Sequence, residues 1–214
     1  MGRHNKQWLE TSNANAVILH SARDGGVTGW QEFGEMSVGG LLVRIGNAAD
    51  LEAVVALERG VAEAPHWSEA TYAGMIGMDA QQSGGVRRCL FVAEIEGRVV
   101  GFAVGKVIGA GRDCVAELES VVVEAGGRRG GVGRALCGAV VEWCRGEGAA
   151  ELELEVRAGS AGAIALYTGL GFVTMGRRAA YYRGIRGLAV SDLAGYGAPA
   201  EDALLMRLEL AKGE

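Results

Sequence analysis

The apolar positions of the chain become regular after a long irregular N-terminal stretch. Leu41–Ile45 is predicted to be a strand, and residues 51–61 then place apolar side chains on one face at helical spacing. Asp50 precedes this helix and is expected to be its N-cap. Ser68 is expected to cap a second helix, over residues 69–78. Three side chains of that helix are expected to face inward: Tyr72, Met75 and Ile76.

The rest of the chain alternates between strand and helix patterns. Two apolar stretches, 89–95 and 99–108, flank a turn at 96–98 and predict a hairpin. The later elements are a strand over 115–123, a helix over 132–145, a strand over 151–157, a short helix over 161–168, a strand from 172 onward and a last strand over 203–210. This order predicts an α/β layered domain with a mixed sheet.

Residues 1–37 lack sustained periodicity and are expected to form a disordered N-terminal extension. Met36 lies just before the first predicted strand, so an over-extended gene start is an alternative explanation for this segment. The regular pattern defines a single domain over residues 38–212.

Composition narrows the classes of protein to consider. A net charge of -5 and a pI near 5.4 argue against a nucleic-acid-binding protein. Four cysteines without C-x-x-C spacing predict reduced core side chains and no metal site: Cys89, Cys114, Cys137 and Cys144. No apolar run approaches the roughly 18 residues of a membrane helix, and no secretory signal is visible, so the expected compartment is the cytoplasm. The oligomeric state is left open.

A glycine-rich loop follows the apolar strand end Val121–Val123. Its residues are Arg129, Gly130, Gly131, Val132, Gly133 and Arg134. The first amides of a helix have no internal partners, and glycines let an anion approach them, so the loop predicts a diphosphate cradle with two arginines beside it. In a chain with 36 glycines, an ordinary turn with solvated arginines is the alternative from the loop alone.

The spacing Arg129-x-Gly131-x-Gly133-Arg134 resembles the acetyl-CoA signature of the GNAT superfamily of N-acetyltransferases. The resemblance runs from about Leu41 to Leu210, and within the superfamily the chain is most similar to the RimI-type branch, the ribosomal-protein-alanine N-acetyltransferases. The further segments that carry it are His66-Trp67-Ser68-Glu69, Leu154 to Tyr167, Leu170-Gly171-Phe172, Arg177-Arg178, Tyr181-Tyr182 and Glu201-Asp202-Ala203. The resemblance implies a GNAT-like acyl-CoA N-acyltransferase fold, with a mixed, mostly antiparallel central sheet flanked by helices, and acetyl-CoA as co-substrate.

Acetyl transfer to an ammonium ion requires a group that removes a proton. Alternation over residues 151–157 places the glutamates on one face, opposite the leucines, and a carboxylate there can act as the base. The resemblance assigns this role to Glu155. Glu153 shares the face, and Glu119, expected to point to the same side as Val121 and Val123, is a second candidate.

Two further needs concern the thioester. A backbone N–H within Val121–Val123 is expected to donate to the carbonyl oxygen as it becomes tetrahedral. The departing thiolate can take a proton from a phenol, and the resemblance assigns this general-acid role to Tyr167. A tyrosine packed on the sheet is the alternative from the residue alone.

Two positions depart from the family pattern. Ser160 stands where the pattern has an asparagine that contacts the cofactor, and its shorter side chain puts that contact in doubt. The stretch from Arg177 to Tyr182 holds one extra residue, so the geometry of the substrate loop is expected to differ. His66 is expected to be structural or exposed.

The predicted function is transfer of acetyl from acetyl-CoA to an amine, with the N-terminal α-amine of a protein such as a ribosomal protein as the implied acceptor. A lysine side chain or a small-molecule amine is the alternative acceptor, and a non-catalytic acetyl-CoA-binding module is the alternative class. No nucleic acid or membrane is expected as a direct partner.

Overall fold

The computed structural model describes residues 36–38, 40–62, 64–76, 85–109, 114–182 and 200–210. The extension expected over residues 1–37 lies outside these ranges except for Met36 and Ser37, which belong to a short first strand.

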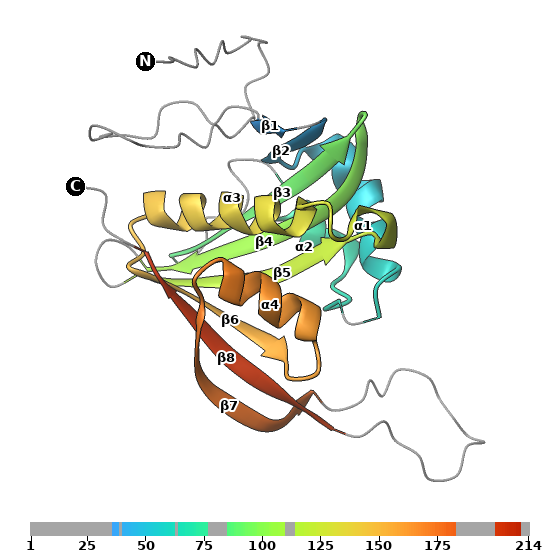
Figure 1. The fold of residues 1–214 in the computed structure, drawn as a ribbon. Helices are drawn as coiled ribbons and strands as arrows, with labels where there is room; N and C mark the ends of the chain where they lie inside the picture. Colours follow the sequence, from blue (N-terminus) through green and yellow to red (C-terminus); the bar gives the residue numbers. More distant parts are fainter. Residues whose placement is uncertain are drawn as a thin grey trace, which may run out of the picture.

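The described strands form one eight-stranded sheet, in the order β1-β2-β3-β4-β5-β6-β8-β7 (Figure 1). Their bounds are β1 (Met36–Val38), β2 (Leu41–Ile45), β3 (Val86–Ile95), β4 (Arg98–Ile108), β5 (Val115–Val123), β6 (Glu151–Arg157), β7 (Val173–Tyr182) and β8 (Glu201–Glu209). Every neighbouring pair is antiparallel except β5 with β6, which is parallel. The predicted mixed, mostly antiparallel sheet is therefore confirmed.

Helices cover both faces of this sheet. They are α1 (Leu51–Arg59), α2 (Glu69–Ala73), α3 (Val132–Gly146) and α4 (Ala161–Gly169), with short 3₁₀ turns at Ala48–Asp50 and Ala125–Gly127. Side chains of α3 and α4 pack into one apolar cluster and those of α1 and α2 into another, on the opposite face (Figure 1). Leu136, Val140 and Cys144 of α3 are buried. Of the three side chains of the second helix predicted to face inward, Tyr72 and Met75 are buried and Ile76 is partly buried.

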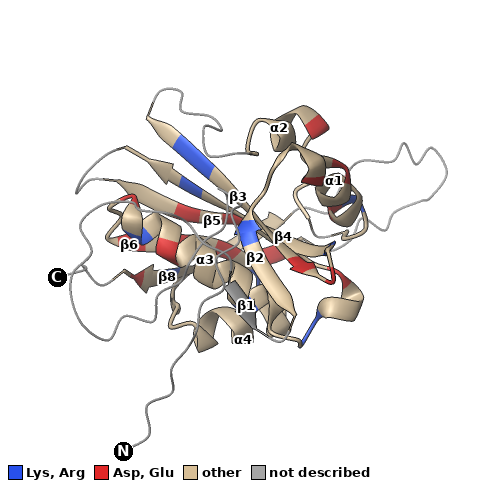
Figure 2. Cartoon of the chain, turned by 90° about the horizontal axis from the view of Figure 1, so that it is seen from above, with Lys and Arg blue, Asp and Glu red and all other residues tan. Residues whose placement is uncertain are grey.

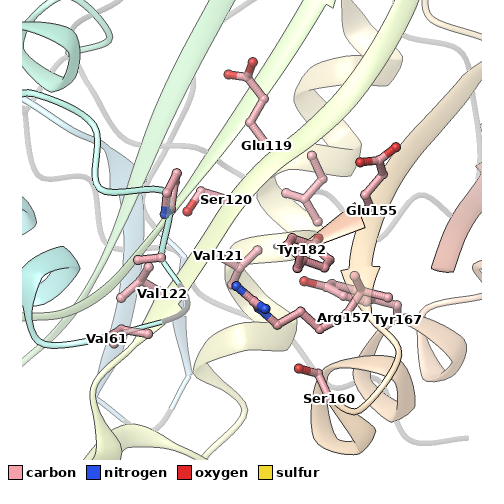
Figure 3. A pocket seen from close by; sticks show the side chains of 14 residues that line it. Val61, Glu119, Ser120, Val121, Val122, Glu155, Arg157, Ser160, Tyr167 and Tyr182 are labelled. Atoms are coloured by element: carbon pink, nitrogen blue, oxygen red, sulfur yellow. The ribbon is translucent and has the colours of Figure 1, made fainter. Parts of the chain in front are cut away.

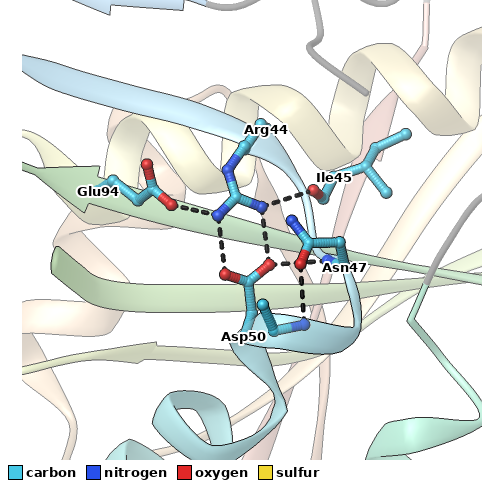
Figure 4. Close-up of polar contacts among 6 residues, drawn as sticks. Arg44, Ile45, Asn47, Asp50 and Glu94 are labelled. Atoms are coloured by element: carbon cyan, nitrogen blue, oxygen red, sulfur yellow. Dashed lines mark hydrogen bonds and ion pairs between the residues drawn. The ribbon is translucent and has the colours of Figure 1, made fainter. Parts of the chain in front are cut away.

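Asp50 is the N-cap residue of α1, as predicted, but its side chain makes no capping hydrogen bond. The capping bonds lie one turn earlier, at the 3₁₀ turn Ala48–Asp50. Asn47 is the capping residue: its Oδ1 accepts the N–H of Ala49 at 2.9 Å, and Asp50 returns the contact by accepting the N–H of Asn47 at 2.7 Å. The carboxylate of Asp50 also accepts two bonds from the guanidinium of Arg44, which bonds Glu94 as well (Figure 4). The ion pair with a neighbouring strand holds Asp50 away from the first amides of α1.

The second predicted helix begins where expected and ends early. The Oγ of Ser68 accepts the N–H of Thr71 at 3.2 Å, so the predicted cap is confirmed. The helix ends at Ala73, with Gly74 as its C-cap. Residues 77 and 78, which the prediction included, lie outside the described residues.

Strand β5 carries a bulge at Glu119. Ser120 pairs with Val104 of β4 and Leu118 pairs with Gly105, so Glu119 is one extra residue on β5. A bulge bends its strand and increases the local twist. It also shifts every later side chain to the opposite face, because side chains alternate with a period of two.

The packing of β5 shows this change of face. Ala116 and Leu118, before the bulge, belong to the cluster under α3. After the bulge, Val121 and Val123 pack against that cluster, while Val122 belongs to the cluster under α1 and α2. Even-numbered residues therefore face α3 on one side of the bulge and odd-numbered residues on the other.

Candidate active site

A pocket opens where β5 and β6 part. The two strands pair at only two positions, Ala116 with Leu152 and Glu117 with Glu153. The pocket, of about 260 Å³, lies beyond those pairs. It is lined by Leu118 to Val122 of β5, Glu155 to Arg157 of β6, Ser160 and Tyr167 of α4 and its start, Tyr182 of β7, and Val61, Ala64 and Pro65 from the segment after α1 (Figure 3).

The pocket brings together one part of the predicted site. Five of the predicted residues line it: Val121, Val122, Glu155, Ser160 and Tyr167. Val123 and the loop over residues 129–134 do not line it. Arg157 lines it without having been assigned a role from the sequence. The sequence pattern could have identified Arg157 as a pocket residue, because it lies two residues after Glu155 and strand alternation places both on one face.

Glu155 projects into the pocket from β6 (Figure 3). Its Oε1 lies 2.7 Å from Nη1 of Arg178 on β7. The interaction with this carboxylate is the main cause that raises the pKa of Tyr181. Arg178 is 56% exposed, so water reaches the contact and an incoming cation can compete for it.

Glu119 faces the pocket from the β5 side but is held more firmly. Arg88 of β3 bonds its carboxylate at 2.8 Å and Lys106 of β4 lies at 3.0 Å. Burial alone would raise the pKa of Glu119, but these two cations outweigh burial and lower it. Figure 2 shows basic segments on the neighbouring strands beside acidic segments of β5.

The prediction that Glu119 points to the same side as Val121 and Val123 is wrong. Its partners Arg88 and Lys106 lie on the face of the sheet away from α3, whereas the two valines pack toward α3. The bulge is the physical reason, because it inserts one residue into the alternation.

Glu153, the other alternative base, lies outside the pocket lining. One of its oxygens accepts two hydrogen bonds from Arg207 of β8, at 2.7 and 3.0 Å. Arg207 also pairs with Glu151. Two of the three acidic side chains on this face of β6 thus share a single arginine as their partner.

Tyr167 reaches the pocket from α4. Its ring packs against Phe172, with centroids 5.8 Å apart. Burial raises the pKa of the phenol, with smaller contributions in the same direction from Cys137 and Tyr182. The group is therefore fully protonated at neutral pH and can serve only as a proton donor there.

Arg157 and Tyr182 form a stacked pair at the pocket wall. The guanidinium carbon lies 4.1 Å from the ring centroid, and Nη1 lies 3.3 Å from Glu201. Glu201 in turn accepts the N–H of Gly159 at 2.8 Å, beside Ser160 at the start of α4. Through Glu201, the stacked pair links β6, β7 and β8 to the start of α4.

The glycine-rich loop lies at the start of α3. Gly131 is the N-cap, with a left-handed φ of 84°, and a Cβ placed there would meet no atom within 4 Å. The space beside Gly131 is therefore open, at a helix start whose first amides have no partners within the helix and are suited to an anion. The guanidinium of Arg134, however, donates to the carbonyl of Gly169 in α4 at 2.7 Å.

Other features to consider in the described part of the chain are a metal site, a reactive cysteine or histidine, and a membrane-spanning helix. No group of three or more His, Cys, Asp or Glu side chains there is placed to hold a metal ion. All four cysteines are buried thiols, as predicted. His66 is 41% exposed at the side chain and lies 3.6 Å from the buried carboxylate of Glu58. Within the described residues, no helix is long and apolar enough to cross a membrane.

Comparison with known proteins identifies the family. Residues 57–172 match the acetyltransferase (GNAT) family. The sequence is 32% identical over 165 residues to the ribosomal protein bS18-alanine N-acetyltransferase of Escherichia coli strain K12. The aligned region covers 77% of this chain and 95% of that protein.

Comparison with solved structures agrees with this family match. The crystal structure of the ribosomal-protein-S18-alanine N-acetyltransferase from Escherichia coli superposes with a TM-score of 0.61 at 29% identity, over 81% of this chain and 96% of that one. NAA60 of Arabidopsis thaliana, solved in complex with acetyl-CoA, shares the fold with a TM-score of 0.61 at 18% identity, over 79% of this chain and 98% of that one. The chain therefore belongs to the GNAT acetyltransferase family and is an acetyl-CoA-dependent N-acetyltransferase.

Proposed function

We propose that the protein acetylates the N-terminal α-amine of a protein, as the Escherichia coli relative does with ribosomal protein bS18. The observation that carries this proposal is the pocket between β5 and β6, which receives an acidic side chain from one wall and a protonated phenol from the helix behind it. A carboxylate, a phenol and an acyl carrier together suffice for direct attack of an amine on a thioester.

Glu155 is the proposed general base. It removes a proton from the incoming ammonium, directly or through a water, as the nitrogen attacks the carbonyl carbon. The water-accessible contact with Arg178 supports this role, because the acceptor's ammonium can take the place of the guanidinium beside the carboxylate. Glu119 is the weaker candidate, since Arg88 and Lys106 already occupy its oxygens.

The segment Val121–Val123 is the proposed source of the oxyanion donor. Its residues pair with β4 on one side. On the other side, the described residues offer no strand partner beyond Glu117, because β6 has turned away. Alternate N–H groups along such an edge point into the gap, where one can donate to the thioester oxygen as negative charge develops.

Tyr167 is the proposed general acid. As the C–S bond breaks, its hydroxyl proton passes to the sulfur, while the new C–N bond retains the acetyl carbon. Its raised pKa supports this role, because the proton stays on the phenol until a strong base, the departing thiolate, appears beside it.

The loop is the proposed diphosphate site, with Arg129, Gly130, Gly131, Val132 and Gly133 presenting backbone amides and charge. The open space in front of Gly131 and the free amides of a helix start support this. Arg134 and Ser160 complete the predicted set, and the side chain of Ser160 makes no capping bond that would hold it away from the pocket.

The acceptor can be tested with an amine panel. The protein is incubated with acetyl-CoA and, separately, with a peptide carrying the N-terminal sequence of ribosomal protein bS18, the same peptide with a blocked N-terminus and an internal lysine, and a polyamine. We expect thiol release only with the free α-amine. Turnover confined to the lysine peptide or the polyamine would contradict the proposal. We place the reaction in the cytoplasm, where ribosomal proteins are made.

A further inference from the structure

The C-terminus of α4 closes on the residue proposed as the general acid. The N–H of Phe172 donates to the carbonyl of Tyr167, and the N–H of Gly171 donates to that of Thr168, each at 3.0 Å. Gly171 has a left-handed φ of 97°. This pair of bonds is a Schellman motif, and the ring contact between Tyr167 and Phe172 is the apolar contact that accompanies it.

The Schellman motif does not provide a hydrogen-bond donor for the last helical carbonyl, that of Gly169. Arg134 supplies it, with Nη2 at 2.7 Å. A cation at a helix C-terminus is doubly favoured, because it satisfies an orphan carbonyl and faces the negative end of the helix dipole. Every carbonyl in the last turn of α4 is therefore bonded, and one of these bonds comes from another helix.

That other helix begins at the cofactor loop. Arg134 lies in the first turn of α3, beside Gly133. A Cβ placed on Gly133 would lie 3.2 Å from Cδ2 of Leu166, so the two helices meet closely at this turn. Figure 1 shows α3 and α4 on the same face of the sheet.

We propose that Arg134 is a positioning residue that fixes the end of α4, and through it the hydroxyl of Tyr167, against the start of α3. This rests on the proposed role of Tyr167. Under this proposal, the residues of the signature loop have two different roles. Gly131 leaves room for the diphosphate, and Arg134 positions Tyr167, the proposed proton donor. The rival role for Arg134 is a direct contact with the diphosphate.

The two roles predict different kinetics. Arg134→Gln, Arg134→Lys, Gly131→Val and Tyr167→Phe are compared with the wild type, with the bS18 N-terminal peptide as acceptor. Arg145→Gln, which changes a partly exposed arginine near the far end of the same helix, is the matched control. The readouts are kcat, the Kd of CoA by calorimetry and the thermal midpoint.

We expect Arg134→Gln to lower kcat by about tenfold while the Kd of CoA stays near that of the wild type, because a small displacement of a reacting group is costly. Lysine at 134 can still donate to the carbonyl and should restore part of kcat. Gly131→Val should weaken CoA binding, and Arg145→Gln should change neither quantity. In the Tyr167→Phe background, Arg134→Gln should have no further effect on kcat.

Three results would overturn the inference. A higher Kd of CoA with unchanged kcat in Arg134→Gln assigns the arginine to the diphosphate. A loss of kcat that multiplies with that of Tyr167→Phe means that Arg134 does not act through the phenol. Full turnover by Tyr167→Phe removes the general-acid role itself, and the inference falls with it; only this last result also contradicts the proposed function.

Discussion

The two walls of the pocket each present a glutamate, but they hold it differently. On the β5 wall, Glu119 is 9% exposed at the side chain and bonds two cations from two neighbouring strands. On the β6 wall, Glu155 is 20% exposed and meets one largely exposed arginine and a tyrosine, both from the edge strand β7.

The contrast separates a structural carboxylate from one that can exchange protons. Two fixed cationic donors favour the ionised form of the Glu119 carboxylate, so its pKa is lowered. A carboxylate beside a solvent-exposed cation, such as Arg178, is expected to exchange that partner for an incoming ammonium more readily. Both residues line the pocket, and we expect only Glu155 to act in the reaction.

Glu155→Gln tests the reactive wall and should have the largest effect. Glutamine keeps the shape but cannot take a proton, so kcat/KM for the peptide acceptor should fall by roughly 10² to 10⁴-fold. The thermal midpoint should change little. Glu153→Gln on the same strand face is the matched control and should keep near wild-type turnover. Equal losses in both variants would mean that the acidic face of β6, and not Glu155 itself, matters.

Tyr167→Phe tests whether the proton donor between the walls is needed, and should have the next largest effect. The ring contact with Phe172 is retained while the proton is lost, so kcat should fall by about 10 to 100-fold with the KM for acetyl-CoA little changed. Steady-state kinetics measure this directly. A rise in KM alone would assign the hydroxyl to binding.

Glu119→Gln tests the structural wall and should affect stability more than turnover. Loss of the charged bonds to Arg88 and Lys106 should cost roughly 2 kcal/mol of unfolding free energy at neutral pH. Because the folded pKa of Glu119 is lowered, this contribution is present above its unfolded pKa of about 4.3 and is lost as pH falls through the folded value.

Urea unfolding of the wild type and of Glu119→Gln, at neutral and at acidic pH, tests whether the stabilising contribution of Glu119 is lost as the pH falls. The stability difference should narrow as the solution becomes more acidic. A drop in turnover comparable to that of Glu155→Gln would instead place Glu119 among the catalytic groups and erase the contrast between the walls.

Local pattern predicted most of the fold. The strands Val115–Val123 and Glu151–Arg157 have the predicted bounds, and α3 begins at the predicted residue. These elements are long, strongly periodic and ended by glycine-containing loops, so their signal lies within the segment itself. The candidate base and acid came from the family resemblance and do line one pocket.

What the sequence did not show depends on contacts between distant strands. Asp50 is at the expected N-cap position but makes no capping bond with α1, because its carboxylate pairs with Arg44. The alternation of β5 is reset at Glu119, where nothing in the local pattern signals an extra residue. The same holds for the stack of Arg157 on Tyr182 and for Arg134 on Gly169, which join residues 25 and 35 positions apart.

The bulge at Glu119 bears on how this pocket can change over evolution or in redesign. Any substitution at this position alters charge or packing but leaves the residue count of β5, and hence the direction of Val121, Val122 and Val123, unchanged. Deleting the residue would instead reverse the facing of all three at once. Point mutations can therefore vary the lining of the pocket without changing the register of β5, whereas an insertion or deletion there would change which way its side chains face.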